Sequence, residues 1–189
     1  MRIAPCDPAF EEVLRSIREQ RVSRAGLAGP YATAECEDGR KAFHRALGGR
    51  GTYLWGSPGT GKTYAAACAL RLWLEAGYPG KLFTAKGLAD FVKEGYSEGY
   101  DALRRVKSYG LLVIDDLGAE RATDWSRELF EDLIDHRLTA GTPTIVTSNH
   151  RIGQLRDLWG GVEGQRIASR LAGACEPVEV CGPDRRLDG

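Results

Sequence analysis

The stretch GTYLWGSPGTGKT, residues 51–63, decides the fold of this chain. Its last eight residues, 56–63, match the P-loop pattern G-x-x-x-x-G-K-[ST] at every fixed position. A loop that wraps a chain of phosphates must point its backbone N–H groups inward, and side chains would block that approach. The sequence therefore predicts a phosphate-binding loop made of Gly56, Ser57, Pro58, Gly59, Thr60, Gly61, Lys62 and Thr63.

The two ends of this loop carry the expected chemistry and the expected neighbours. Lys62 is predicted to place its charge at the β- and γ-phosphates of a nucleotide, and Thr63 to offer a hydroxyl ligand to Mg²⁺. Residues 52–55 are typical of a short buried strand, and apolar residues at helical spacing follow over 65–76. A glycine-rich turn that matches by chance is the alternative, but the strand before and the helix after favour the P-loop.

Composition limits the classes of protein. The chain has 189 residues, which suffice for one domain, with 42% hydrophobic and 28% charged residues. It holds 26 Lys plus Arg and 26 Asp plus Glu, so nucleic acid could bind only at a local basic patch. No apolar run approaches ~18 residues and the start lacks a signal-peptide core, so we expect no membrane span. The five cysteines form no C-x-x-C pair, and a reducing, cytoplasmic setting is expected.

Strand-like and helix-like segments alternate along the chain. Strands are predicted over 81–84, 111–114, 144–147 and 178–180, and helices over 43–47, 86–109 (two, broken near 95–99), 124–140, 152–158 and 162–171. This alternation predicts an α/β fold with a parallel sheet covered by helices on both faces. A further amphipathic helix begins at Pro8, with apolar residues at 10, 13, 14 and 17. Its apolar stripe either packs on the core or binds a partner.

Polar residues follow two of the predicted strands. Asp115 and Asp116 end the apolar run 111–114, where sheet proteins of this type place their ligands. Asp115 would orient a water on Mg²⁺ and Asp116 the water that attacks the nucleotide, unless both merely cap the next turn. Asn149, just past the strand 144–147, could hold that attacking water or be an ordinary turn residue.

Two basic features lie elsewhere. Arg166 and Arg170 are four residues apart on one helix face, which suits an arginine finger or a solvated basic face. Aromatic and basic residues interleave over 91–107, as in single-strand binders, although acidic residues dilute the patch and a helix pair packed by its aromatics is the alternative. The predicted DNA-binding residues are Tyr96, Arg104, Arg105 and Lys107.

Five motifs in order, GSPGTGKT, LLVIDDLGAE, TIVTSN, RIASRL and GPDRR, resemble the AAA+ ATPases of the DnaC/DnaI-type helicase loaders and the related IstB-type transposition helpers. The resemblance covers roughly residues 27–187. It implies a three-layer P-loop NTPase fold with a five-stranded parallel sheet in the order 5-1-4-3-2, and ATP-dependent self-assembly on single-stranded DNA. It further implies that Asn149 is sensor I, that Arg170, with Arg166 in reserve, is the arginine finger, and that Arg186 contacts nucleotide as a second sensor.

The chain departs from the family pattern in three places. Asp116 stands where many AAA+ proteins have Glu, which would slow hydrolysis because the side chain is one methylene shorter. A C-terminal helical lid domain is not expected after the last strand. The N-terminal part is brief, so we expect a short helical extension over residues 1–40 and an ATPase domain over 41–189.

These features predict an ATP-dependent replicative helicase loader that uses ATP and Mg²⁺ and partners with a helicase, single-stranded DNA and copies of itself. The runner-up is an IstB-type transposition helper with a transposase as partner, and a third possibility is a scaffold that binds ATP without hydrolysing it. A small-molecule kinase is disfavoured because no arginine-rich lid is apparent. A GTPase is disfavoured because no N-K-x-D motif occurs.

Overall fold

The computed structural model describes residues 8–98, 101–119 and 123–184. The strands are β1 (Gly51–Trp55), β2 (Gly80–Thr84), β3 (Leu111–Asp115), β4 (Thr144–Ser148) and β5 (Cys175–Glu179). The helices are α1 (Pro8–Arg24), α2 (Glu37–Leu47), α3 (Lys62–Glu75), α4 (Ala85–Ser97), α5 (Ala102–Lys107), α6 (Asp124–Thr139), α7 (Ile152–Trp159) and α8 (Gly161–Ala174), with a 3-10 turn η1 (Gly29–Tyr31).

The five strands form one parallel sheet in the order β2-β3-β4-β1-β5. Read from the other edge this is 5-1-4-3-2, so the predicted strand order is confirmed. The P-loop strand β1 lies between β4 and β5, and β4 separates it from β3. The loops that follow β1, β3 and β4 therefore open at the same edge of the sheet.

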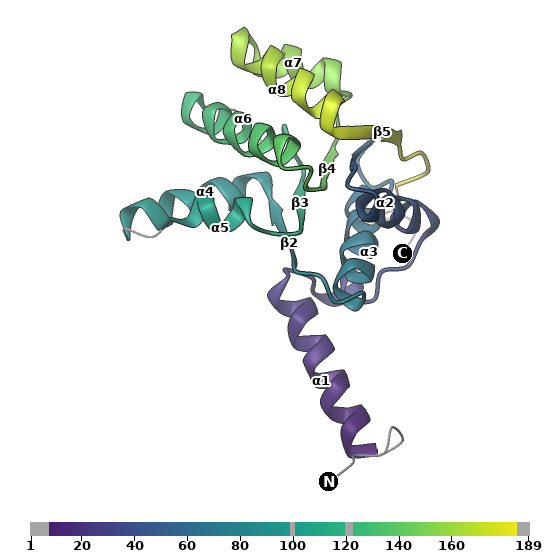
Figure 1. Cartoon of the computed structure of the whole chain (residues 1–189). Helices are drawn as coiled ribbons and strands as arrows, with labels where there is room; N and C mark the ends of the chain where they lie inside the picture. The colour runs from purple at the N-terminus through teal and green to yellow at the C-terminus, as the bar shows by residue number, and fades with distance from the viewer. Residues whose placement is uncertain (1–7, 99–100, 120–122, 185–189) are drawn as a thin grey trace.

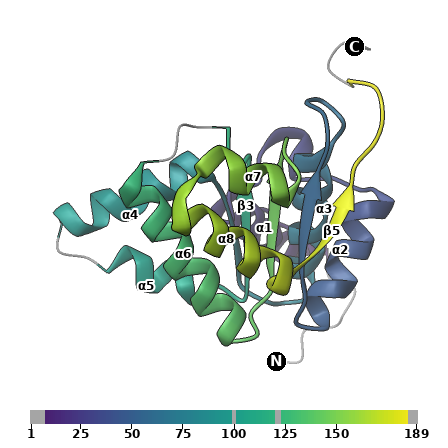
Figure 2. The ribbon, with the colours of Figure 1, turned by 90° about the horizontal axis from the view of Figure 1, so that it is seen from above.

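Helices cover both faces of the sheet, as predicted. Figures 1 and 2 show α2 and α3 on one face and α4 to α8 on the other. Because alternate residues of a strand point to opposite faces, β3 contributes Leu112 and Ile114 to the core under α4–α8 and Val113 to the core under α2 and α3. Every residue of β3 and β4 is buried, which is typical of central parallel strands.

Two elements differ from the prediction. The last strand begins at Cys175 rather than at residue 178, because Pro177 is tolerated on β5, which lies at the edge of the sheet and among the described strands pairs with β1 alone. The helix α2 starts at Glu37, six residues earlier than expected, and includes Gly39. A Cβ atom at Gly39 would lie 2.5 Å from the Cβ of Cys68, so this glycine lets α2 approach α3 closely.

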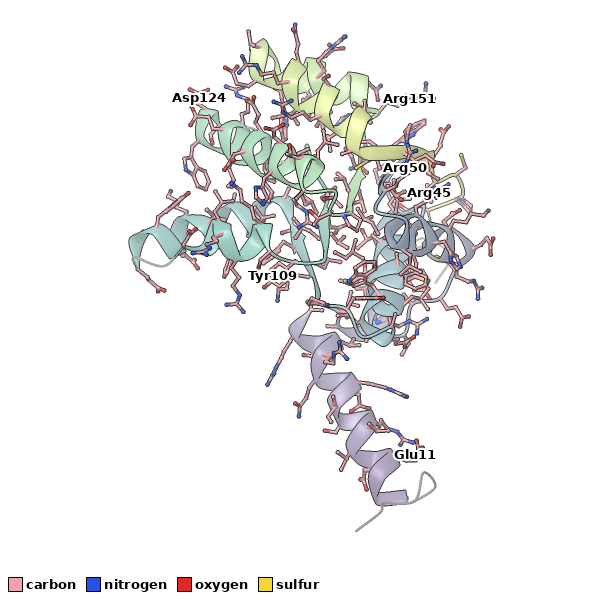
Figure 3. All side chains as sticks on the ribbon, in the orientation of Figure 1. Glu11, Arg45, Arg50, Tyr109, Asp124 and Arg151 are labelled. Carbon is pink, nitrogen blue, oxygen red and sulfur yellow. The ribbon has the colours of Figure 1, made fainter. Side chains whose placement is uncertain are left out.

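The helix α1 projects away from the rest of the molecule (Figure 1). Its apolar residues Val13 and Ile17 are 55% and 47% exposed, so that part of the stripe does not pack on the core. Figure 3 shows side chains filling the space between the sheet and its covering helices, whereas those of α1, including Glu11, point into the open. Among the described residues, no helix is long and apolar enough to cross a membrane.

Candidate nucleotide-binding site

A cavity of about 680 Å³ opens at the carboxyl ends of the central strands. The P-loop, the ends of β3 and β4, and the segment that follows α1 all contribute to its walls. Its lining residues are Gly26, Leu27, Pro30, Tyr31, Pro58, Gly59, Gly61, Lys62, Thr63, Tyr64, Leu82, Thr84, Asp115, Asp116, Thr147 and Asn149.

The P-loop needs its glycines for conformation and for close approach. Gly56, Gly59 and Gly61 have φ angles of 152°, 78° and 100°, which side chains rarely adopt. Lys62 is 7% exposed, and its Nζ donates hydrogen bonds to the carbonyl oxygens of Gly56 and Ser57 at 2.8 and 2.7 Å. The ammonium is therefore held at the loop, at the start of α3, where the helix dipole favours anions.

The remaining P-loop residues brace this arrangement. Thr60 is buried, and its hydroxyl donates to the carbonyl oxygen of Ser57 at 3.0 Å. A Cβ atom at Gly59 would collide with the carboxylate of Asp184, so the chain after β5 runs against the loop. Arg186, predicted to contact nucleotide as a second sensor, lies outside the described residues.

Asp115 is the centre of the polar contacts in the cavity. Its Oδ1 accepts hydrogen bonds from the hydroxyls of Thr63 at 2.9 Å and Thr147 at 2.7 Å. Burial raises the pKa of Asp115, and the neighbouring charge of Asp116 raises it further. The hydrogen bonds from Thr147 and Thr63 and the charge of Lys62 lower it. The structure thus links the P-loop, β3 and β4 through one carboxylate.

Asp116 and Asn149 are exposed residues on the cavity wall. Asp116 has a φ of 61°, an uncommon left-handed conformation that aspartate tolerates better than most residues. Its backbone N–H donates to the hydroxyl of Thr147 at 2.8 Å, which fixes this turn against β4. The sequence prediction that Asp115, Asp116 and Asn149 gather near the P-loop agrees with their placement; their catalytic roles stay a prediction.

The donor set fits Mg²⁺. This ion prefers oxygen ligands and keeps several waters, with one or two protein carboxylates and the phosphates of a nucleotide. The hydroxyl of Thr63 and a carboxylate oxygen of Asp115 lie 2.9 Å apart on the cavity wall and supply such oxygens. Thr63 and Asp115 could therefore hold a magnesium ion that accompanies a nucleotide.

Sequence reasoning missed two contributors to the cavity. Thr147 received no role, although its hydroxyl contacts both acidic residues; its place at the end of β4, beside β3, could have indicated it. The segment 26–31 supplies Leu27, Pro30 and Tyr31 to the wall from before the P-loop strand. No local pattern marks it, because contacts distant in sequence hold it beside β2, among them the hydrogen bond from Leu82 N–H to the carbonyl oxygen of Ala25 at 2.8 Å.

The two candidate arginine fingers lie away from this cavity. Among the described residues that line it, neither Arg166 nor Arg170 occurs. On α8, Arg170 Nε lies 2.9 Å from Asp135 Oδ1, at ion-pair distance but without hydrogen-bond geometry. Arg166 lies 3.5 Å from Glu131 Oε1. Both arginines therefore face acidic residues of α6, and Arg170 keeps 35% of its side chain exposed.

The residues predicted to bind DNA are dispersed over α4 and α5. Tyr96 is 56% exposed, and Arg104 and Arg105 are exposed. Lys107 instead pairs with Asp132 of α6 at 2.7 Å. Phe91, the first aromatic residue of the pattern, packs against Phe83 with ring centroids 5.3 Å apart. The exposed members of the set are thus Tyr96, Arg104 and Arg105.

Comparisons with known proteins agree with this architecture. The replicative helicase loader DnaI of Bacillus subtilis (strain 168) is 28% identical over 160 residues, which cover 77% of this chain and 50% of DnaI. The replicative helicase loader DnaC of Escherichia coli (strain K12) is 22% identical over 183 residues, 86% of this chain and 73% of DnaC. The chain therefore spans half the length of DnaI.

A solved structure and the sequence model of a protein family also match this chain. A crystal structure of the DnaC helicase loader superimposes with a TM-score of 0.69 at 28% identity, covering 82% of this chain and 100% of that one. This similarity and the strand order confirm the predicted AAA+ P-loop fold. The sequence model of the IstB-like ATP binding proteins matches residues 50–188. This chain therefore belongs to the IstB-like ATP binding protein family, within the helicase-loader-like AAA+ proteins.

Proposed function

We propose that this protein is an ATP-dependent loader of a replicative DNA helicase. The observation that carries the proposal is the series of hydrogen bonds Thr63–Asp115–Thr147, which joins the P-loop to the ends of β3 and β4 within one cavity. The similarity of this protein to the loaders DnaI and DnaC supports a helicase as its partner. The exposed Val13 and Ile17 on the projecting helix α1 offer a surface for that partner.

ATP would lie between the P-loop and the segment 26–31. The backbone N–H groups of the loop and the start of α3 would bind the phosphates, and Lys62 would move its ammonium from the loop carbonyls to the β- and γ-phosphates. Leu27, Pro30 and Tyr31 give the other wall an apolar character that suits a base. A bound Mg²⁺ would neutralise phosphate charge, with Thr63 and Asp115 as its protein-side oxygens.

Hydrolysis would use the two remaining polar residues of the cavity wall. Asp116 would accept a proton from, or orient, the attacking water, and Asn149 would hold that water without adding charge. Aspartate is one methylene shorter than the glutamate common in AAA+ proteins, so we expect slow turnover by the isolated protein. Arg170, which lies outside its own cavity, would act on the nucleotide of a neighbouring subunit.

The test uses two variants and two partners. Lys62→Ala removes the charge that binds the phosphates and should abolish ATP binding, whereas Asp116→Asn should retain binding and lose turnover. Tagged parent protein should co-purify with the replicative helicase of its own source in ATP, and the Lys62→Ala variant should not. Co-purification with a transposase instead would overturn the loader in favour of a transposition helper, and equal turnover in parent and Asp116→Asn would overturn the role of Asp116.

Single-stranded DNA would bind along the exposed part of α4 and α5. Stacking of a base on an aromatic side chain contributes about 1–3 kcal/mol, and arginines bind the phosphates. Tyr96→Ala together with Arg104→Ala should therefore weaken binding of an oligonucleotide roughly tenfold or more and reduce its salt dependence. Phe91→Leu, a change at a packed position, is the matched control. Binding curves that overlay those of the parent would place the DNA site elsewhere.

A further inference from the structure

The segment 34–36 is bound along one face of the P-loop helix α3. The backbone N–H of Glu35 donates to the hydroxyl of Tyr64 at 3.1 Å, and Arg71 Nε donates to the carbonyl oxygen of Ala34 at 2.9 Å. Between them, Cys68 Sγ lies 3.7 Å from the carbonyl oxygen of Cys36. Residues 64, 68 and 71 are spaced four and three apart and therefore share one helix face.

Two cysteine thiols meet at the middle of this contact. Cys36, the N-cap of α2, is half-buried, and Cys68 is buried beneath the start of α2. The Cys68 thiol donates to the backbone carbonyl oxygen of Cys36, and the two side chains perturb each other's pKa. The close packing at Gly39, whose Cβ would lie 2.6 Å from the sulfur of Cys68, keeps that sulfur at the α2–α3 contact.

The surroundings of Cys68 favour its thiolate. The interaction with the Cys36 side chain lowers the pKa of Cys68, burial opposes this, and the nearby charges of Arg71 and Arg40 lower it further. The pKa of Cys36 is raised, first by its interaction with the Cys68 side chain and then by burial. Two neighbouring thiols, one of which has a lowered pKa, are a starting point for disulfide chemistry.

The other described cysteines differ from this pair. Burial raises the pKa of Cys175 to about 12, and its sulfur lies 3.5 Å from the carbonyl oxygen of Thr144. Cys181 is exposed. Neither has a second described cysteine as its hydrogen-bond partner. The Cys36–Cys68 pair is therefore the place in the described chain where oxidation would be intramolecular and selective.

We propose that Cys36 and Cys68 form a reversible oxidation site, at which a disulfide fixes the segment before α2 onto the P-loop helix. With a hydroperoxide as oxidant, the Cys68 thiolate attacks the outer oxygen, the O–O bond breaks and hydroxide (for hydrogen peroxide) leaves, which gives a sulfenic acid. The Cys36 sulfur then attacks the Cys68 sulfur, the S–O bond breaks and water leaves with the Cys36 proton. Two thiols are oxidised by two electrons and one peroxide is reduced.

The disulfide would act on the nucleotide cavity through the chain before it. Leu27, Pro30 and Tyr31 line the cavity, and they precede Cys36 by nine, six and five positions in the chain. Tyr64, on the other side of the contact, lines it as well. Tethering Cys36 to α3 would restrict the movement of this wall and slow nucleotide exchange. That consequence depends on the proposed ATP site, whereas the disulfide itself does not.

The first experiment maps the bond. The full-length protein is treated with a small excess of diamide, which takes up two hydrogens from two thiols, and digested with trypsin without reduction. The expected product links peptide 25–40, which contains Cys36, to peptide 63–71, which contains Cys68, and dithiothreitol reverses it. Cys181→Ser should retain this product and Cys36→Ser should lose it. Unlinked peptides 25–40 and 63–71 after consumption of the Cys181 thiol would overturn the proposal.

The second experiment measures the effect on the chain. Hydrogen exchange over residues 25–36 should slow in the oxidised protein and return to the parent rate on reduction, with no change in Cys36→Ser. A fluorescent ATP analogue should leave the oxidised protein several-fold more slowly than the reduced protein. Unchanged hydrogen exchange over residues 25–36 in protein that fully carries the Cys36–Cys68 disulfide would overturn the proposed tether. A linked protein with slowed exchange that binds no ATP analogue in either state would support the oxidation site and contradict the proposed function.

Discussion

Thr147 connects the two acidic residues of the cavity through one hydroxyl group. It donates to Asp115 at 2.7 Å and accepts from the backbone N–H of Asp116 at 2.8 Å. A hydroxyl can donate once and accept twice, so both bonds form together. The Thr147 side chain therefore helps to position Asp115, which we propose as a magnesium ligand, and the turn that carries Asp116, which we propose to orient the attacking water.

Replacing Thr147 by valine should weaken magnesium-dependent ATP binding in a pH-dependent way. The hydrogen bond from Thr147 lowers the pKa of Asp115, so its loss raises that pKa and leaves a smaller ionised fraction at any given pH. Only the ionised carboxylate binds the metal. Because a hydrogen bond to a charged group contributes about 1.5–3 kcal/mol, affinity should fall roughly tenfold or more, with a larger loss at mildly acidic than at mildly alkaline pH.

Titrations of ATP with and without Mg²⁺ across this pH range measure the effect. Thr147→Ser keeps the hydroxyl and is the matched control, which should bind like the parent. A Thr147→Val loss that is the same at every pH would mean that the residue acts through the turn at Asp116 alone, and not through the ionisation of Asp115.

The residues that line the cavity were predictable from sequence where they form a local pattern in the chain. The P-loop glycines, Lys62 and Thr63 form one continuous pattern, and Asp115 and Asp116 end an apolar run. Thr147 and Tyr31 could not be assigned in this way, because they reach the cavity through strand order and through the Ala25–Leu82 backbone pairing. Such contacts depend on three-dimensional neighbours rather than on spacing.

At the scale of elements, a buried arginine joins α6 to the amino-terminal ends of β3 and β4. Arg137 is 1% exposed, and its guanidinium donates to the hydroxyl of Thr144 and to the carbonyl oxygens of Lys107, Tyr109 and Pro143. Burial lowers its pKa to about 10, so the group stays charged at neutral pH. The bonds tie the end of α6 to the segment before β3 and to the start of β4.

Arg137→Met should destabilise the whole fold. Methionine preserves much of the apolar stem but leaves four accepting groups without this donor, and each buried group without a partner costs about 1–3 kcal/mol. Because the relaxed structure recovers some of this, we expect the free energy of unfolding to fall by about 2–4 kcal/mol, measured by urea denaturation. Arg18→Met, on the exposed face of α1, is the control. Equal stability of both variants would contradict a structural role for Arg137.

Strands and helices were predictable from sequence where the pattern of apolar residues matches the pattern of buried residues in the fold. The apolar runs of β3 and β4 predicted central parallel strands, and both are buried throughout. The start of β5 was missed because Pro177 resembles a strand breaker, and only its position on the sheet edge makes it acceptable. The first turns of α2 were missed because Gly39 resembles a loop residue, whereas it allows close packing on Cys68.

At the scale of the whole molecule, we propose that a neighbouring subunit completes the candidate site. The cavity holds a P-loop, two acidic residues and Asn149, but no described arginine lines it. Arg166 and Arg170 lie one turn apart on α8 and face Glu131 and Asp135, one turn apart on α6. An arginine that stabilises transferred phosphate would then come from another subunit, for which Arg170 would leave Asp135.

Mixing two inactive variants tests this arrangement. Arg170→Ala should bind ATP nearly as the parent does, because the residue lies outside its own cavity, yet lose turnover and ATP-dependent assembly. Lys62→Ala should fail to bind ATP but keep an intact Arg170. In mixed assemblies some interfaces pair an intact P-loop with an intact arginine, so ATPase activity should partly return, in proportion to the number of such interfaces. The matched control mixes Lys62→Ala with Asp116→Asn, which both damage the nucleotide side and should restore nothing. Mixed oligomers that form, as shown by differential tags, but stay inactive with Arg170→Ala would mean that Arg170 does not act across subunits; Arg166→Ala would then be tested in the same way.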